Sequence, residues 1–301
     1  MTLNTLHHAL CAALLAALPL TVASAQPDTL EKIRQTHTIN VGIRSGARPF
    51  SFFDEQKQPA GYTVDLCQKV LTQIRKELKL GDLKVSYVPV SAEDRIPKLQ
   101  NGTIDLECGS TTNTKARTEK VDFSYSTFVS SIKLAARVGS GITTPASLAG
   151  KTIALTRGTT AEKLFTQLRA SEIRNINLVY FPTNTESVKA LQAGKAQAFA
   201  GDDVLIAGLL STLPDGKQFA IVGDGLSVGP YAIMMRKGDK ALRELTDKTL
   251  ASVFASGEIN AIYKRWFEND KIKIPMSALT REAITRPSHD SGIARLLGYS
   301  L

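Results

Sequence analysis

The sequence predicts an α/β fold in which mostly parallel strands are covered by helices. Stretches that alternate between apolar and polar residues, typical of strands, take turns along the chain with stretches whose apolar residues recur at helical spacing. The composition is that of an ordinary globular protein, with 43% hydrophobic and 22% charged residues among 301. A repeated strand–helix order implies a mostly parallel sheet with helices on its faces.

The start of the chain indicates export. Residues 1–25 contain no Lys, Arg, Asp or Glu, and the apolar run Ala9–Leu20 leads to the small residues Ala23-Ser24-Ala25. We therefore expect a secretory signal peptide that is cleaved after Ala25. A membrane anchor is disfavoured because the apolar run is short and Pro19 interrupts it.

Cleavage would leave two cysteines, Cys67 and Cys108. In an oxidising compartment they can form a disulfide, or they can remain two buried thiols. The sequence leaves both alternatives open because it does not show whether the geometry fits.

The net charge of +9 raises the question of an acidic partner. Lys and Arg are scattered along the chain, with no basic run and no interleaving with aromatic residues. We therefore expect no nucleic-acid partner. A basic exterior fits anionic small molecules or docking to a membrane partner equally well.

The first half of the chain predicts one strand–helix unit. Its helices open at Gly61-Tyr62 and after Ser91-Ala92-Glu93-Asp94, a segment that resembles a capping box. The third strand of this unit is expected to end at a loop over residues 109–113. The predicted strands are Thr38–Ile43, Lys84–Val90 and Thr103–Cys108.

A second unit of the same kind follows. Its strands are predicted at Lys151–Leu155, Asn177–Phe181 and Ala196–Ala200, and its helices at Ala161–Arg169 and Glu186–Ala193. Beyond it, Thr246–Phe267 predicts an amphipathic helix that breaks at Gly257, with Trp266 in the core. After Lys273 the chain is polar and predicts either a wrapping tail or a partly disordered segment.

Three arginines are the first candidates for a binding site. Arg44, Arg95 and Arg117 fall in or just after the loops that follow predicted strands, where parallel sheets bind their ligands. A guanidinium holds a carboxylate by two parallel hydrogen bonds. Three of them in one cleft would suit a small ligand with two carboxylates, whereas the alternative is three solvated surface cations.

Two further motifs allow a functional and a structural interpretation. The turn Gly158-Thr159-Thr160 can present backbone N–H groups to an anion, or it can simply cap the following helix with a Thr. Asp202 or Asp203 can bind an ammonium group, or cap a helix. Since adjacent strand residues point to opposite faces, the two carboxylates are not expected in one site.

Several chemistries are not indicated. The predicted mature chain has two histidines, His37 and His289, and no Cys or His cluster with the spacing of metal ligands. It contains no phosphate-binding P-loop. We expect neither a metal nor a cofactor.

An ordered set of short motifs spans Leu30 to Phe267 and is specific as a set. It includes Val41-Gly42-Ile43-Arg44, Gly61-Tyr62-Thr63-Val64-Asp65, Glu107-Cys108-Gly109-Ser110-Thr111-Thr112-Asn113, Gly158-Thr159-Thr160 and Asp202-Asp203. In these motifs the chain resembles the periplasmic substrate-binding proteins of polar amino acid ABC transporters, and among them the glutamate/aspartate-binding proteins.

The resemblance implies a type II periplasmic-binding-protein fold. Two lobes, each a mostly parallel sheet flanked by helices, would be joined by two hinge strands and close over an amino acid. Lobe 1 would comprise residues 26–131 with 230–301, and lobe 2 residues 132–229. The crossings would lie near Ser131–Arg137 and Gly225–Met235.

The resemblance also implies roles for individual residues. Arg117, helped by Ser110 and Thr112, matches the arginine that holds the α-carboxylate of the ligand. Arg44 and Arg95 match the pair that faces the side-chain carboxylate. In lobe 2, Thr160 matches a hydroxyl beside the ligand and Asp202 the carboxylate that takes the α-ammonium.

The chain departs from the family pattern at four positions. Ala92 replaces a serine beside the ligand, Asn184 replaces a histidine, and Arg157 replaces a smaller polar residue. Ile233 replaces a cysteine that would pair with Cys108, so any disulfide of Cys108 would have to use Cys67.

The resemblance implies a monomeric, periplasmic binding protein and not an enzyme. It would capture L-glutamate or L-aspartate and deliver it to an ABC transporter permease in the inner membrane. One alternative is an enzyme similar to cyclohexadienyl dehydratase on the same fold, which would need a general acid in the cleft. Glu107 is the nearest candidate, but the resemblance places it under the loop. A ligand-sensing module is the other alternative.

Overall fold

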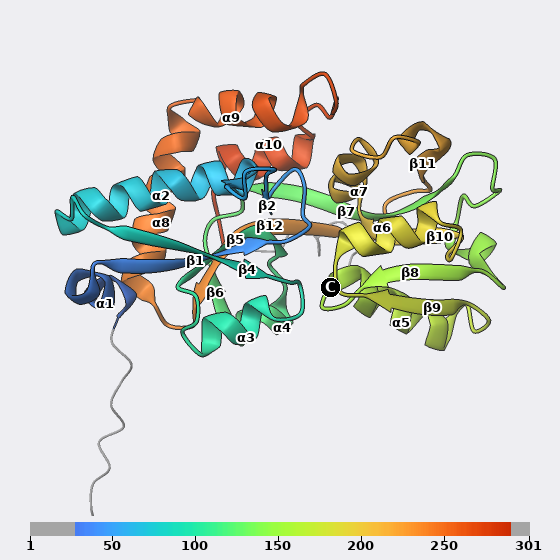
Figure 1. Ribbon diagram of the computed structural model, residues 1–301, viewed down its shortest axis with the longest axis horizontal. Helices are drawn as coiled ribbons and strands as arrows, with labels where there is room; N and C mark the ends of the chain where they lie inside the picture. Colours follow the sequence, from blue (N-terminus) through green and yellow to red (C-terminus); the bar gives the residue numbers. More distant parts are fainter. Residues whose placement is uncertain (1–27, 290–301) are drawn as a thin grey trace, which may run out of the picture.

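Ten strands of the chain form one sheet that continues through two lobes (Figure 1). The computed structural model describes residues 28–289, so the predicted signal peptide and the last residues lie outside the described part. From edge to edge the strands follow the order β4 (Lys84–Val90), β1 (Thr38–Arg44), β5 (Leu106–Thr112), β12 (Val228–Arg236), β7 (Phe128–Arg137), β10 (Ala198–Asp202), β8 (Thr152–Thr156) and β9 (Asn177–Phe181). Two short strands pair at the side, β6 (Val121–Phe123) with β12 and β11 (Phe219–Val222) with β7.

In the first lobe, β1 lies between β4 and β5 and is parallel to both, while β12 adds to β5 in the antiparallel sense. One face is covered by α1 (Thr29–Thr36), α2 (Tyr62–Leu78), α8 (Lys240–Ala255) and α9 (Glu258–Phe267). The other face carries α3 (Arg95–Gln100) and α4 (Lys115–Thr118), and α3 packs there on β5, β6 and β12. A small hairpin of β2 (Phe52–Phe53) and β3 (Pro59–Ala60) lies beside this sheet.

In the second lobe, β8 is parallel to its neighbours β9 and β10, and β7 is antiparallel to β10. The helix α5 (Thr160–Ser171) packs on one face through Phe165, and α6 (Asn184–Gln192) and α7 (Asp203–Leu210) pack on the other. The short 3-10 turns Pro145–Leu148 and Gly216–Gln218 lie in the connections. The sheet of each lobe therefore has three neighbouring parallel strands and one further strand added in the antiparallel sense.

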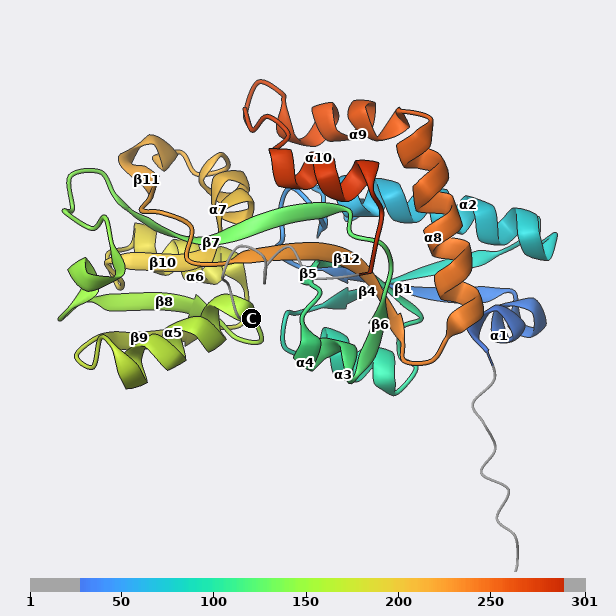
Figure 2. The ribbon, with the colours of Figure 1, turned by 180° about the vertical axis from the view of Figure 1, so that it is seen from behind.

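The two extending strands, β7 and β12, run from one lobe to the other (Figure 2). They pair with each other from Val228 opposite Ser131 to Tyr231 opposite Phe128, in the region where the resemblance implied the crossings. The helix α10 (Ala278–Thr285) packs against β7, with Thr280 Oγ1 accepting from the Val129 amide at 3.1 Å. Up to residue 289 the polar tail therefore wraps the protein.

Each lobe has hydrophobic clusters of its own, although the largest cluster also takes in Val204 and Leu205 of α7 in the second lobe. The largest cluster joins α2, α8 and α9 to β1 and β5, and two others lie on either side of the β8–β10 sheet. We propose on this basis that the lobe boundaries are those predicted, residues 26–131 with 230–301 and residues 132–229. Between residues 28 and 289, no helix has the length and apolar character needed to cross a bilayer.

Most elements lie where the sequence predicts them, and β4 and β9 have the predicted bounds. The two reciprocal hydrogen bonds of the predicted box form, from the Asp94 amide to Ser91 Oγ (3.0 Å) and from the Ser91 amide to the Asp94 carboxylate (2.7 Å). They lie in the turn before α3, whose N-cap residue Asp94 makes no side-chain hydrogen bond to the helix. The late amphipathic helix begins earlier than predicted, at Lys240, and Gly257 separates it into two helices.

The prediction for the third strand was wrong. The predicted strand Thr103–Cys108 and the loop after it are replaced by β5, Leu106–Thr112. The segment after Cys108 is extended because Thr111 and Thr112 pair with Ala232 and Tyr231 of β12. A partner so distant in sequence leaves no local pattern, and Gly-Ser-Thr-Thr is typical of a loop.

The two cysteines form a disulfide. Cys67 in the middle of α2 bonds to Cys108 of β5, with an S–S distance of 2.00 Å and a Cα–Cα distance of 6.2 Å. Both residues are buried in the largest core. The bond therefore fastens α2 to the strand that also carries Ser110 and Thr112.

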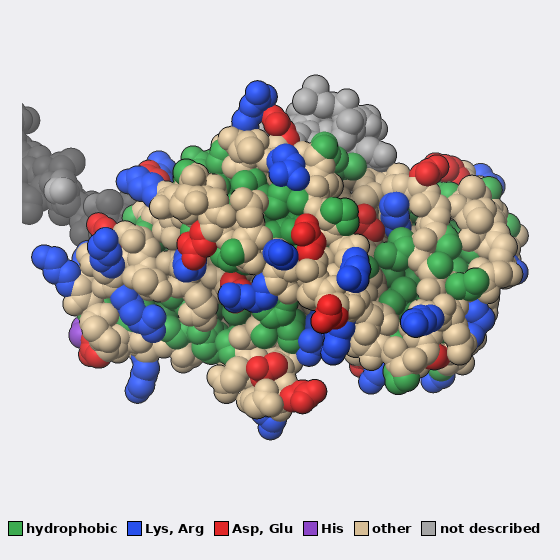
Figure 3. Space-filling view, turned by 90° about the horizontal axis from the view of Figure 1, so that it is seen from above, with side chains coloured by type: hydrophobic (Ala, Val, Ile, Leu, Met, Phe, Trp, Pro, Cys, Tyr) green, Lys and Arg blue, Asp and Glu red, His purple; other side chains and the backbone are tan. Residues whose placement is uncertain are grey.

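The charged side chains are spread over the surface. In Figure 3, Lys and Arg side chains are interspersed with acidic ones over the face shown. This dispersion agrees with the scattered basic residues of the sequence.

We expect the double variant Cys67→Ser/Cys108→Ser to lose stability. The bond closes a loop with a sequence separation of 41, and constraining such a loop in the unfolded chain contributes about 2–4 kcal/mol. Guanidinium denaturation should show this loss, and reductant should lower the stability of the wild type but not of the variant. If the double variant and the oxidised wild type unfold at the same guanidinium concentration, the expectation is contradicted.

Candidate functional site

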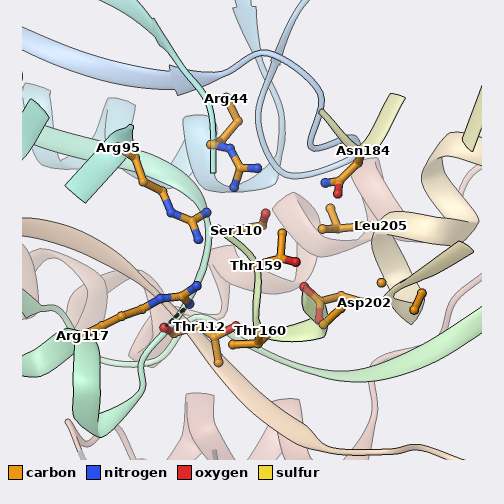
Figure 4. Close-up of a pocket in the computed structure, with 13 residues that line it drawn as sticks. Arg44, Arg95, Ser110, Thr112, Arg117, Thr159, Thr160, Asn184, Asp202 and Leu205 are labelled. Atoms are coloured by element: carbon orange, nitrogen blue, oxygen red, sulfur yellow. Dashed lines mark hydrogen bonds between the residues drawn. The ribbon is translucent and has the colours of Figure 1, made fainter. Parts of the chain in front are cut away.

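A cavity between the two lobes brings together all seven predicted site residues (Figure 4). The space between its atoms amounts to about 340 Å³ when the solvent at its mouth is included. It is lined by Arg44, Arg95, Ser110, Thr112, Arg117, Thr159, Thr160, Ala161, Asn184, Ala200, Gly201, Asp202 and Leu205.

The sheet of the first lobe positions one wall of this cavity. Arg44 is the last residue of β1, and its backbone amide donates to Ser51 Oγ (3.0 Å). Ser110 and Thr112 are alternate residues of β5, so both side chains point to the same side of the strand. Since β1 and β5 are parallel neighbours, these three residues meet at one edge of the sheet.

Short helices position the other two arginines of the first lobe. Arg95 is the first residue of α3. Arg117 lies in α4, whose first turn is capped by the Thr114 side chain, and its Nη1 donates to the Thr112 carbonyl oxygen at 2.9 Å. In Figure 4 the guanidinium groups of Arg44, Arg95 and Arg117 point into the same space. We refer to these three residues as the arginine cluster.

The second lobe contacts this wall directly. The carbonyl oxygen of Gly158 accepts from Arg117 Nη2 at 3.0 Å and from Arg95 Nη2 at 3.4 Å. Gly158 has a φ of +74°, and a Cβ there would lie 2.5 Å from the Ala92 carbonyl oxygen. Only glycine allows so close an approach without strain. On the other side of the cavity, Asn184 Nδ2 donates to the Gly46 carbonyl oxygen at 3.3 Å.

Two members of the arginine cluster are buried with little compensation, whereas Arg117 is half-buried. Arg44 and Arg95 are 4% and 2% exposed, and within the described residues the Nε of each has no hydrogen-bond partner. Burial lowers the pKa of all three, that of Arg117 to about 10, and repulsion from Arg44 and Arg117 lowers the pKa of Arg95 further. A buried positive charge without a partner costs several kcal/mol, so the cavity is suited to an anion.

Asp202 faces the arginine cluster from the second lobe (Figure 4). It ends β10 and accepts a short hydrogen bond from the Tyr231 hydroxyl of β12. Burial raises its pKa to about 6, although the Tyr231 bond acts in the opposite direction. Asp203 accepts instead from the Ser131 amide at 3.3 Å. The two carboxylates diverge as predicted, and Asp202 makes no capping hydrogen bond to α7.

The turn before α5 confirms the capping interpretation, and the anion-binding interpretation stays a prediction. Thr159 caps the helix, accepting from the Glu162 amide at 3.1 Å. Thr159 and Thr160 also line the cavity. Ser110 Oγ lies in the opposite wall, and it is buried without a hydrogen-bond partner among the described residues. An unpaired hydroxyl of this kind is available to a ligand.

Some relevant residues were not predicted from the sequence. Leu205 lines the cavity from α7, but nothing distinguishes it in the sequence from a core leucine. Tyr231 reaches Asp202 from another strand, and only the pairing of β12 shows this. Asn184 was noted as a departure from the family pattern, and it does line the cavity.

The arrangement can bind a ligand with negative charge at both ends and a positive group between them. Within residues 28–289 no group of three or more His, Cys, Asp or Glu side chains is placed to hold a metal ion. Guanidinium and hydroxyl donors on one wall and a carboxylate on the other are the chemistry that an acidic amino acid requires.

Sequence comparison finds both a family and close relatives. The family model for bacterial extracellular solute-binding proteins, family 3, matches residues 39–269. The L-glutamate/L-aspartate-binding protein of Pseudomonas aeruginosa is 38% identical over 95% of this chain and 96% of its own length. The glutamate/aspartate import solute-binding protein of Escherichia coli is 36% identical over 82% of each chain.

Solved structures share the architecture. The cysteine-binding protein of Campylobacter jejuni superposes with a TM-score of 0.72, covering 84% of this chain and 98% of its own, at 26% identity. The two-lobed periplasmic-binding fold of type II is therefore confirmed.

We expect Tyr231→Phe to raise the pKa of Asp202 above its value of about 6, because the variant loses the hydroxyl that stabilises the carboxylate. Carbon NMR of the Asp202 carboxyl group across pH would measure the shift. Tyr263→Phe is the control, since Tyr263 is also buried but its hydroxyl has no hydrogen-bond partner in the described chain. An unshifted pKa in Tyr231→Phe would contradict the assignment.

Proposed function

We propose, since the chain belongs to the bacterial extracellular solute-binding proteins of family 3, that it captures L-glutamate or L-aspartate between its lobes for an ABC transporter. The observation that carries the proposal is a cavity between the lobes with three guanidinium groups on one wall, two of them buried and that of Arg117 half-buried, and a single carboxylate on the other. The names of the Pseudomonas and Escherichia relatives support the same ligand class.

Each end of the ligand would have its own partners. Arg117 would hold the α-carboxylate together with the hydroxyls of Ser110 and Thr112. Its guanidinium is already oriented by the Thr112 carbonyl oxygen, so little freedom would be lost on binding. Arg44 and Arg95 would face the side-chain carboxylate with the donors that lack partners in the described structure.

The second lobe would complete the site. Asp202 would accept the α-ammonium group, held in place by the Tyr231 hydroxyl. Thr160, at the first turn of α5, would donate its hydroxyl beside the α-carboxylate, where the helix N-terminus also favours negative charge. Because these groups come from both lobes, the complete site exists only when the lobes are closed.

The charges would give selectivity for an acid over its amide. Charge-assisted hydrogen bonds contribute roughly 1.5–3 kcal/mol each. Glutamine would leave the buried charges of Arg44 and Arg95 without a counter-ion, which is costly. Micromolar binding requires only about 8 kcal/mol in total, which such a set of contacts can supply.

The remaining parts of the proposal concern transport. The predicted signal peptide would direct the protein to the periplasm, and closure about β7 and β12 would present the loaded, monomeric form to the permease in the inner membrane. We propose binding without catalysis, as the names of the relatives indicate. Glu107, the candidate general acid of the enzyme alternative, is fully buried behind the cavity wall.

A thermal-shift screen over the twenty amino acids tests the ligand class. A ligand that binds only the folded protein raises its melting temperature, so glutamate and aspartate should give the largest shifts. A larger shift with a neutral or basic amino acid would refute the proposed class.

We expect Arg95→Ala to weaken glutamate binding by about 30-fold or more, since removing one partner of a buried charge pair costs about 2–5 kcal/mol. Glutamine should lose less than about tenfold, because it has no charge for Arg95 to balance. Calorimetry measures both. Arg265→Ala is a charge-matched control, as Arg265 pairs with Asp65 on the surface of the first lobe. Equal losses for both ligands would contradict the role of Arg95.

We expect glutamate binding to weaken as the pH falls through about 6, because protonation of Asp202 removes the acceptor for the ammonium group. Affinity at pH 5 should be about tenfold lower than at pH 7. Asp202→Asn should bind weakly and show little change between these two pH values. A wild-type affinity that is the same at pH 5 and pH 7 would exclude this role of Asp202.

A further inference from the structure

A buried carboxylate lies behind the cavity wall in the first lobe. Glu107 of β5 is 0% exposed. Its Oε2 accepts from Thr111 Oγ1 at 2.9 Å, but its Oε1 has no hydrogen-bond partner within the described residues. A half-satisfied, buried carboxylate is costly unless a nearby positive charge compensates it.

The compensating charge is on the arginine cluster, and Gly109 makes the approach possible. A Cβ on Gly109 would lie 1.9 Å from Glu107 Oε1 and 2.8 Å from Arg44 Cγ. The two side chains therefore occupy the two sides of the space that a larger residue at position 109 would fill. Glu107 and Arg44 form no direct ion pair in residues 28–289, so the carboxylate acts through space.

The electrostatic effect of Glu107 reaches the whole cluster. Among the opposite charges that counter the lowering of the Arg44 pKa by burial, Glu107 is the strongest. It acts in the same direction on the pKa values of Arg95 and Arg117. Glu107 is thus coupled to all three arginines without lining the cavity.

We propose that Glu107 is a specificity-determining residue that acts through the arginine cluster by setting the net charge of the site. The three arginines bring three positive charges, and Asp202 and Glu107 bring two negative ones, which leaves a single positive charge. An amino acid with two carboxylates and one ammonium group carries one negative charge and neutralises it. The inference rests on the proposed function and deepens it, since it states the ligand charge that the site accepts.

Removing the charge of Glu107 should change the preferred ligand charge in a defined direction. Glu107→Gln keeps the size of the side chain and an oxygen for Thr111, but leaves the site with one more positive charge. That site matches a dicarboxylate without an ammonium group, such as glutarate. Each additional negative charge on the ligand should raise the affinity of the variant about tenfold, the size expected for unit charges roughly 10 Å apart at an effective dielectric constant of about 20.

Calorimetry with three ligands of similar size tests this. In Glu107→Gln the affinity for glutarate relative to that for glutamate should rise about tenfold, and the affinity for glutamine relative to that for glutamate should fall about tenfold. Equal changes for all three ligands would show that Glu107 is only structural, and would overturn the inference.

Two control variants separate charge from structure. Glu107→Asp keeps the charge, so the ratios among its affinities for the three ligands should equal those of the wild type. Thr111→Val removes the hydrogen bond to Oε2 and leaves the charge, so its ratios should also be those of the wild type even if its melting temperature falls. Altered ratios in Thr111→Val, with the charge present, would contradict the inference.

A double variant covers the case in which Glu107→Gln does not fold. Glu107→Gln/Arg44→Gln has the net charge of the wild type and should recover folding, seen as a higher melting temperature. A double variant no more stable than Glu107→Gln would count against the inference. A wild type that binds none of the three ligands would refute the proposed function and this inference with it, whereas wild-type glutamate binding with unchanged ratios in Glu107→Gln refutes the inference alone.

Discussion

The gathering of three guanidinium groups in one cavity, two of them buried and the third half-buried, is the constraint on which the rest of this structure depends. Each group would be more stable in water, and the repulsion among them adds to the cost, as the depressed pKa of Arg95 indicates. The protein compensates in part with Asp202 in front of the cluster and Glu107 behind it. The remaining positive charge is what an anionic ligand would neutralise, so the same imbalance that costs stability provides affinity.

The architecture allows this arrangement because both walls of the cavity are built on rigid elements. The first wall is formed by the ends of parallel strands that are joined to α2 by the Cys67–Cys108 disulfide. The second wall is carried by the turn before α5 and by the end of β10. Within the described sheet β7 and β12 connect the two walls, and Val204 and Leu205 of α7 also pack into the core of the first lobe.

The local fold was largely predictable from the sequence, because the elements obey local rules. The strand Lys84–Val90 and the reciprocal hydrogen bonds between Ser91 and Asp94 lie where the pattern indicated. The segment after Cys108 was not predictable, because its extended conformation depends on β12, more than a hundred residues away in the chain. The choice between a disulfide and two thiols was likewise open until the distance between α2 and β5 was known.

The sequence by itself determined the residue types, and the family resemblance predicted roles for seven side chains that would suit an amino acid with two carboxylates. Only the tertiary structure decided that they line one cavity, that Tyr231 holds Asp202, and that Glu107 lies beside Gly109 and Arg44. The reason is physical. Residue type fixes charge and hydrogen-bonding capacity, whereas burial, and with it the strength of each charge, depends on contacts between segments far apart in the chain.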